Sequence, residues 1–455
     1  MGVNYIKAMK STIHLRSKWA KEEAERISSG KRRYLHFDYR ITDVNRAAQR
    51  LTPGYVAGHS FYPFILREKK RRKYKKDPKT RKPRIHEKIR PIAYAAHYDA
   101  LIYSWYGYLL SHYYEEKIAL LGITDNVIAY RKLGKSNLDF ANEIIEYIRA
   151  QAYPCHVICL DLEKFFDTLD HKLLKENWID TISESKLPSD HYAVYKNITR
   201  FSYVNYDEIL GELNIAREEL RSLQRYCSPE EFRNLRSSVS GFVKKNPNIE
   251  LRQGIPQGST ISAILSNVYM LGFDREIAKL ASDMDGLYRR YSDDIIVIVP
   301  ESSDVFALKE AMLRSVNKAK VSINDSKTEE LIYEPLSSTS GKFLNAESKK
   351  PAYLQYLGVQ FDGSNTLLRH SGIAAFQRKM KKIVRKFARK SQRAGRPFPK
   401  KRIYGRFFYS KESNYLAYAK RAANTLKSNA ISRQVKKQKI LKSIKNSIQK
   451  SSVKD

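Results

Sequence analysis

The stretch Tyr291–Val299 (YSDDIIVIV) places two adjacent carboxylates, Asp293 and Asp294, directly before five β-branched residues. The apolar run lacks polar alternation, which is typical of a strand buried on both faces. Two neighbouring carboxylates at the edge of a packed core repel each other unless they lie in water or share a cation. A divalent metal ion would satisfy both, although an Asp-Asp pair taken alone more often caps a turn or a helix.

A second apolar strand that ends in a carboxylate lies upstream, where Val157–Leu160 leads into Asp161. If this strand lies beside Ile295–Val299, Asp161 meets Asp293 although 132 residues separate them in the chain. Three carboxylates at neighbouring strand ends would form the oxygen-rich site that Mg²⁺ prefers. Two such ions about 4 Å apart can activate an attacking hydroxyl and stabilise a leaving pyrophosphate.

The charge of the chain indicates a polyanionic partner. The 455 residues carry a formal net charge of +36, and 42 % of them are hydrophobic, enough to fill a sizeable core. From Ala374 onward there are 26 Lys and Arg against two acids, and Arg67–Arg84 holds twelve against two. No apolar run approaches the ~20 residues that span a bilayer, and no secretory signal opens the sequence. We therefore expect a cytoplasmic protein without a membrane partner.

Three further stretches carry candidate binding residues. Gly254–Ser262 is a glycine-flanked turn in which Gln257 could contact a sugar or base, or simply an ordinary Gly-Pro turn capped by Ser259. The basic run Arg67–Arg84 predicts an exposed arm or a β-hairpin, and Arg90, which follows it, is a candidate phosphate contact. Arg131 is either a triphosphate clamp or a surface charge at a turn.

The order of these blocks resembles that of reverse transcriptases, over roughly Arg81–Phe361. The resemblance implies an α+β fold of the right-hand polymerase type, with fingers, a palm of antiparallel sheet plus helices, and a basic helical thumb. It implies an N-terminal extension (1–66), fingers (67–150), a palm with fingers elements and a helical insertion at about 183–248 (151–365), and a thumb and tail (366–455). Five blocks carry it: Cys159–Asp170, Gly254–Ser262, Tyr291–Asp294, Asn324–Thr328 and Tyr356–Phe361.

The resemblance also implies the roles of single residues. Asp161, Asp293 and Asp294 would be the catalytic metal site for two Mg²⁺ ions, with Mn²⁺ as a possible substitute, and the backbone carbonyl of Leu162 would add a ligand. Lys327 matches the residue suspected of protonating pyrophosphate.

The predicted nucleotide-binding residues follow from the same resemblance. Phe166 matches the aromatic gate that excludes a ribose 2′-hydroxyl, which favours DNA synthesis. Gln257 matches the residue that touches the incoming nucleotide, and Arg131 and Arg90 match fingers positions near the triphosphate.

The blocks resemble bacterial enzymes of the retron and group II intron type more than retroviral ones. The sequence shows neither an endonuclease-like Cys/His cluster nor an RNase H carboxylate set, and only about 90 residues follow Tyr356–Phe361. These features suggest a stand-alone, defence-associated (anti-phage) reverse transcriptase.

The predicted function is RNA-directed DNA synthesis by two-metal-ion catalysis. Its partners would be an RNA template, a DNA product and deoxynucleoside triphosphates, with a noncoding RNA, a partner protein or a second copy of the chain as further candidates. The alternatives are untemplated or protein-primed DNA synthesis by the same site, and a catalytically silent nucleic-acid-binding protein.

Overall fold

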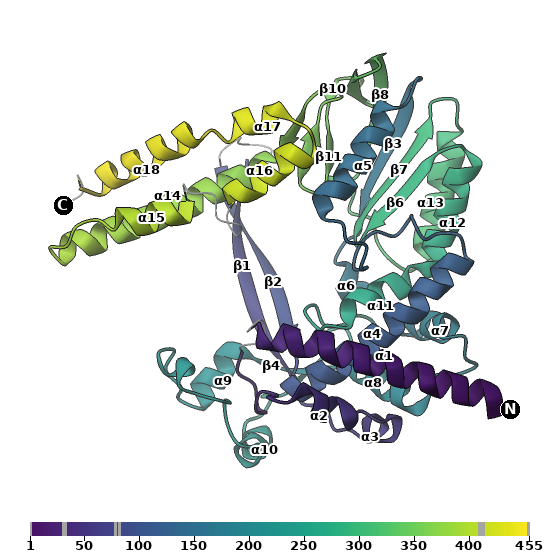
Figure 1. Cartoon of the computed structure of the whole chain (residues 1–455), viewed down its shortest axis with the longest axis vertical. Coiled ribbons are helices and arrows are strands. Elements are labelled where there is room, and N and C mark those ends of the chain that lie inside the picture. The colour runs from purple at the N-terminus through teal and green to yellow at the C-terminus, as the bar shows by residue number, and fades with distance from the viewer. Residues whose placement is uncertain (1, 30–33, 77–79, 81–82, 408–414, 453–455) are drawn as a thin grey trace. The chain divides into compact units, whose positions relative to one another are not determined.

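The structure, a computed structural model, describes residues 2–29, 34–76, 80, 83–407 and 415–452. The chain divides into two compact units, which Figure 1 traces in the order of the sequence. The first unit comprises Met1–Arg131, Leu162–Ala278 and Glu310–Ile323, and the second comprises Lys132–Asp161, Lys279–Lys309 and Asn324–Asp455. Each unit combines helices with β-strands, which confirms the mixed α and β class predicted from the sequence.

A six-stranded antiparallel sheet organises the second unit, with the strand order β10-β9-β8-β3-β7-β6. The interior strand β7, which lies between β3 and β6, is buried at five consecutive positions, Ile295–Val299, so the apolar run is a strand covered on both faces. β3 pairs with β7 along its whole length, which confirms that the two carboxylate-bearing strands are neighbours. The strands are β3 (Cys155–Asp161), β6 (Leu287–Tyr291), β7 (Asp294–Pro300), β8 (Glu329–Ser337), β9 (Ser340–Asn345) and β10 (Pro351–Ala352).

One face of this sheet packs against α5 (Asn137–Arg149) and a small three-stranded sheet. α5 begins with a capping box between Ser136 and Asp139, and it buries an apolar stripe that includes Ile144 and Ile148. The small sheet consists of β11 (Leu354–Tyr356), β12 (Val359–Phe361) and β13 (Thr366–Leu368). Two further helices, α16 (Tyr415–Thr425) and α17 (Asn429–Gln434), complete this core.

The basic C-terminal part is helical, as its apolar stripe predicts. α14 (His370–Arg393) and α18 (Lys437–Ser452) run along each other, and α15 (Lys400–Phe407) joins them in a separate core. Met380, Val384 and Ile444 are buried in that core, so the many cations of α14 lie on its outer side.

The first unit contains the predicted β-hairpin, formed by β1 (Phe64–Lys76) and β2 (Pro83–Tyr94). Residues 77–79 and 81–82 lie outside the described part of the chain. β1 also pairs in parallel with β4 (Ser202–Asn205), which in turn pairs with β5 (Lys244–Lys245).

Helices make up the rest of the first unit. The long helix α4 (His97–Leu120) is almost entirely buried in its first half. Between residues 183 and 248 the chain forms helices and the strands β4 and β5, and the domain boundaries stay predictions. No helix in the described part of the chain combines the length and apolar character needed to cross a bilayer.

Two further helices, α12 (Leu271–Asp283) and α13 (Val305–Lys318), have residues in both units. The other described helices are α1 (Gly2–Ser28), α2 (Val44–Gln49), α3 (Pro53–Ala57), α6 (Phe165–Thr168), α7 (His171–Thr181), α8 (Ser189–Thr199), α9 (Tyr206–Glu212), η1 (Glu219–Arg221), α10 (Pro229–Ser238), α11 (Ser262–Tyr269) and η2 (Asp325–Lys327).

Candidate active site

Two of the predicted catalytic carboxylates lie opposite each other at the ends of neighbouring strands of the six-stranded sheet. Asp161 is the last residue of β3, Asp294 is the first residue of β7, and the two are cross-strand partners. Directly opposed residues of an antiparallel pair have Cβ atoms about 4.5–5.5 Å apart, so the two side chains share one environment. Asp161 is only 8 % exposed.

Asp293 lies in the two-residue turn between β6 and β7. Ser292, which precedes it, is buried and has a φ of 62°, a left-handed conformation that is uncommon outside glycine. Tyr291 and Asp294 pair on either side of the turn, so the hairpin fixes where Asp293 can lie.

Lys327, at the end of η2, forms an ion pair with Asp161. The backbone N–H of Asn324 donates to the backbone carbonyl of Asp161 at 2.8 Å, and the side-chain amide of Asn324 lies 3.4 Å from Asp161 Oδ1. The segment Asn324–Lys327 therefore holds the strand end that carries Asp161 and brings a cation to its carboxylate.

The electrostatics of the site are those of crowded carboxylates. Loss of water at the strand end, followed by the negative charges of Asp293 and Asp161, raises the pKa of Asp294 to about 6. The positive charges of Lys327 and Arg369 oppose this rise in the pKa of Asp294. A cation bound between the carboxylates would relieve the repulsion that remains.

The donor chemistry fits a hard divalent cation, because Asp161, Asp293 and Asp294 supply only carboxylate oxygens. However, no three His, Cys, Asp or Glu side chains of the described residues converge closely enough to form a ready-made metal site. Asp161 is engaged by the ammonium group of Lys327 instead. A metal ion held by these carboxylates would thus compete with Lys327 for Asp161.

The first unit holds a cavity of about 310 Å³ beside the predicted nucleotide-binding turn. Gln257 lines this cavity, and its backbone carbonyl accepts a hydrogen bond from the N–H of Ala93 at 2.9 Å. The backbone thus joins the Gly254–Ser262 turn to β2, and Gln257 is a cavity residue as well as part of a turn. The residues that line the cavity are Leu66, Pro91, Ala93, Lys164, Asp167, Phe201, Asn246, Pro247, Asn248, Gly254, Ile255, Pro256 and Gln257.

Two glycines are required by the close packing of this turn. A Cβ atom at Gly258, where φ is +120°, would lie 2.6 Å from the carbonyl oxygen of Ala93. A Cβ atom at Gly254, where φ is +86°, would lie 2.9 Å from the carbonyl oxygen of Asp167. Only glycine allows these backbones to approach so closely.

Phe166 lies on the short helix α6 and is half-buried, with its ring centroid 5.6 Å from that of Phe165. Its carbonyl accepts a hydrogen bond from the N–H of Ile255 at 2.9 Å, so it is tied to the same turn as Gln257. The ring is not among the groups that line the cavity. Its assignment as a sugar gate therefore stays a prediction.

Arg131 is neither an exposed charge nor a free clamp. Its side chain is 2 % exposed, and its guanidinium donates to both carboxylate oxygens of Glu115 at 2.8 and 2.6 Å. It also donates to the backbone carbonyls of Val127, at 2.6 Å, and Thr124. These bonds give Arg131 a structural role in its own turn, and a nucleotide contact stays a prediction.

Two predicted residues remain, Arg90 and Leu162. Arg90 is exposed on β2, opposite Lys69 of β1. Leu162 directly follows Asp161 and forms an isolated β-bridge with Ile323.

The sequence reasoning missed two residues, one in each unit. Arg290 is fully buried next to the Asp293 turn, and Asn248 donates its side-chain amide to the carbonyl of Asp167 at 2.8 Å. β6 reads Leu-Tyr-Arg-Arg-Tyr, so no sequence pattern distinguishes Arg290 from Arg289, and none marks Asn248.

Residues 216–361 match the family described as "Reverse transcriptase (RNA-dependent DNA polymerase)". The matched region includes Gln257, Asp293, Asp294 and Lys327, and it begins after Asp161 and Phe166. No curated protein matches the sequence.

Solved structures similar to this chain include three structures of telomerases from two Candida species. Apo telomerase from Candida tropicalis aligns with a TM-score of 0.42 at 11 % identity, over 81 % of this chain and 56 % of that one. Its form truncated from the C-terminal domain gives a TM-score of 0.38 at 11 % identity, over 67 % and 57 %. Telomerase from Candida albicans in complex with a fragment of telomeric RNA gives 0.40 at 12 %, over 90 % and 65 %. The chain thus spans less than two thirds of the length of these telomerases.

The antiparallel sheet that carries Asp161 and Asp294 and the family match at residues 216–361 agree with the predicted right-hand polymerase fold. Domains of this family generally use divalent metal ions. Residues 216–361 match a reverse transcriptase domain, the domain of an RNA-directed DNA polymerase.

Proposed function

We propose that this protein is an RNA-directed DNA polymerase whose active site lies at the ends of β3 and β7. The observation that carries the proposal is the pairing of Asp161 with Asp294, which would let both carboxylates hold the same cations. The reverse transcriptase match includes the Asp293-Asp294 turn, which supports the same assignment.

The three aspartates would hold two divalent cations, for which Mg²⁺ is the best fit to an all-carboxylate donor set. When bound, the cations promote attack by the primer 3′-hydroxyl and stabilise the charge that develops on the pyrophosphate. Lys327, once released from Asp161, would carry the proton that the leaving pyrophosphate accepts from its Nζ atom. The ion pair seen here keeps that ammonium group next to the reacting centre.

The residues of the first unit would select the nucleotide. Gln257, in the cavity beside β2, would contact the incoming nucleotide through its amide group. Phe166 would exclude the 2′-hydroxyl of a ribonucleotide with its ring, which makes deoxynucleoside triphosphates the substrate.

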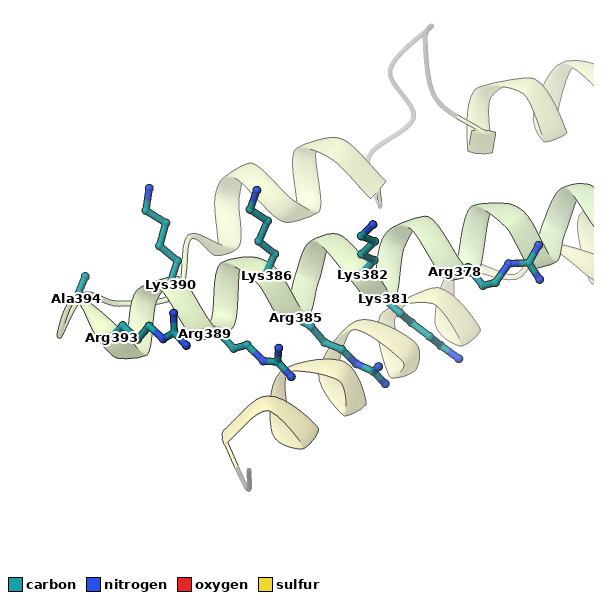
Figure 2. Close-up of a pocket in the computed structure, with 9 residues that line it drawn as sticks. All are labelled: Arg378, Lys381, Lys382, Arg385, Lys386, Arg389, Lys390, Arg393 and Ala394. Atoms are coloured by element: carbon teal, nitrogen blue, oxygen red, sulfur yellow. The ribbon is translucent and has the colours of Figure 1, made fainter. Parts of the chain in front are cut away.

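The helix α14 would bind the template and product backbones. Figure 2 shows its cations along the helix, with Lys382, Lys386 and Lys390 pointing to one side and Arg385 and Arg389 to the opposite side. α14 contains no acidic residue, and its cations enter no ion pair within the described part of the chain. Such a stripe neutralises phosphates without reading a sequence.

Primer extension on an RNA template tests the proposal. The wild-type protein should extend a DNA primer with deoxynucleotides in the presence of Mg²⁺, and Asp293→Asn should abolish extension while template binding remains. Extension by Asp293→Asn at the wild-type rate would refute the proposed site. A product that stays attached to the protein after nuclease treatment and is released by protease would indicate protein priming instead.

We further propose that the enzyme acts in the bacterial cytoplasm in defence against phages, with a noncoding RNA as template. The proposal rests on the resemblance of its sequence blocks to bacterial stand-alone enzymes and on its excess of positive charge. Deleting the gene in its host should increase sensitivity to at least some phages. Unchanged sensitivity across a broad phage panel would contradict this role.

A further inference from the structure

Arg290 is one of the largest side chains in the protein that are fully buried, with an exposed fraction of 0 %. It lies on β6, opposite Ile295 of β7, two residues before the turn that contains Asp293. A guanidinium group is costly to remove from water unless hydrogen bonds satisfy it. Because Arg290 is buried beside the proposed active site, we ask which group of that site it binds.

The guanidinium of Arg290 donates a hydrogen bond from Nη1 to the backbone carbonyl of Ser292 at 3.1 Å. This carbonyl belongs to the peptide group that joins Ser292 to Asp293. A hydrogen bond from a charged donor is stronger than one of the same geometry between neutral groups. The buried guanidinium thus fixes the orientation of that peptide group, and with it the position of the backbone nitrogen of Asp293.

The peptide group needs this support because Ser292 has a φ of 62°. L-residues other than Asn and Asp rarely adopt this conformation, since their Cβ crowds the neighbouring carbonyl oxygen. Ser292 is also 3 % exposed, so water cannot take over the role of the arginine. A glycine would adopt the same conformation without strain.

We propose that Arg290 is a positioning residue, which holds the Ser292 turn in its left-handed conformation so that Asp293 and Asp294 can bind divalent cations together. The inference rests on the proposed function. It also explains why arginine stands here, because its planar group stays charged and keeps a fixed donor geometry, which lysine lacks.

Four proteins test the proposal: wild type, Arg290→Lys, Ser292→Gly and the double variant. Binding of Mn²⁺, followed by electron paramagnetic resonance, is the readout, with the melting temperature measured in parallel. Arg290→Lys should bind Mn²⁺ about 10- to 100-fold more weakly, the range expected when a group behind a metal ligand is lost. Ser292→Gly should bind it as the wild type does, and the double variant should regain most of the lost affinity.

Arg314→Gln is the matched control, because this arginine is exposed and pairs with Glu310 on its own helix. Its Mn²⁺ affinity should equal that of the wild type. If Arg290→Lys alone does not fold, the double variant decides. A folded double variant with wild-type affinity supports the proposal, whereas a double variant that also fails to fold overturns it, because Arg290 then serves the core and not the turn.

Equal Mn²⁺ affinity in wild type and Arg290→Lys would also overturn the proposal. So would a double variant whose Mn²⁺ affinity stays as low as that of Arg290→Lys. The proposed function fails separately. In that case the wild-type protein binds Mn²⁺ and responds to these substitutions as described, yet it does not extend a primer on RNA.

Discussion

Asp161 and Asp294 are direct partners across the β3–β7 ladder although 133 residues separate them in the chain. The pairing sets two carboxylates against each other at a strand end, where their repulsion has to be compensated. In this structure the ammonium group of Lys327 supplies part of that compensation at Asp161. In the proposed catalytic site, Lys327 compensates part of the negative charge of the aspartates, and a bound divalent cation would compensate the rest.

Replacing Lys327 with methionine should tighten Mn²⁺ binding and slow nucleotide incorporation. The cation no longer competes with an ammonium group for Asp161, but the proton donor for pyrophosphate is lost. Mn²⁺ affinity by electron paramagnetic resonance and single-turnover incorporation measure the two effects. Weaker Mn²⁺ binding in this variant would mean that Lys327 supports the metal site and does not compete with it.

Phe166→Ala should allow incorporation of ribonucleotides, because the ring proposed to exclude the 2′-hydroxyl is removed. The ratio of kcat/KM for a deoxynucleotide to that for the matching ribonucleotide should fall by about tenfold or more, since steric discrimination is worth about 1–3 kcal/mol. Phe165→Leu is the neighbouring control, because Phe165 is buried and serves packing. Unchanged sugar selectivity in Phe166→Ala would remove the gate assignment.

Gly258→Ala should destabilise the protein by roughly 1–3 kcal/mol and raise the KM for the nucleotide. The added Cβ would lie 2.6 Å from the Ala93 carbonyl, in a backbone conformation that disfavours alanine. Gly211→Ala is the control, because that glycine lies in α9 and a Cβ there meets no atom within 4 Å. Chemical denaturation compares the two, and equal stability would contradict the packing described for the turn.

Arg131→Met should lower the free energy of unfolding by roughly 1–3 kcal/mol, since it removes the charged hydrogen bonds to Glu115 and two carbonyls. The KM for deoxynucleotides should stay within about twofold of the wild type. Urea unfolding and steady-state kinetics separate the two. A large rise in KM with unchanged stability would support the role of Arg131 as a triphosphate clamp, which the resemblance implies.

The combined replacement of Arg385 and Arg389 by glutamine should weaken duplex binding and its salt dependence. Each phosphate contact contributes about 0.9 to the slope of log affinity against log salt, so the slope should fall by up to about 2. The combined variant Lys172→Gln and Arg314→Gln removes two cations that already pair with acids on their own helices. An equal loss of slope in this control would show that net charge, and not the α14 stripe, governs binding.

The sequence predicted the strands and carboxylates of the second unit well, because buried strands leave a strong hydrophobic signal. Ile295–Val299 is an uninterrupted apolar run, and Asp161 ends a second one, so both strand ends could be located without a structure. Charge and proline placement left an exposed arm or a β-hairpin open for the basic run, and the structure shows the hairpin of β1 and β2.

The environment of single side chains could not be predicted. Arg131 stands at a turn in the sequence, yet its guanidinium pairs with Glu115, sixteen residues upstream on α4. The ion pair between Lys327 and Asp161 spans 166 residues and depends on how η2 meets the end of β3. Contacts of this kind arise from tertiary packing, which leaves no local periodicity to read.

The most direct test of the account is single-turnover incorporation of a deoxynucleotide by Asp161→Asn on an RNA template with a DNA primer. Loss of this carboxylate should reduce the rate by roughly 1,000-fold, equivalent to about 4 kcal/mol of transition-state stabilisation, while the affinity for the template and primer stays unchanged. A variant that incorporates nucleotides at the wild-type rate would show that Asp161 and Asp294 do not form the active site.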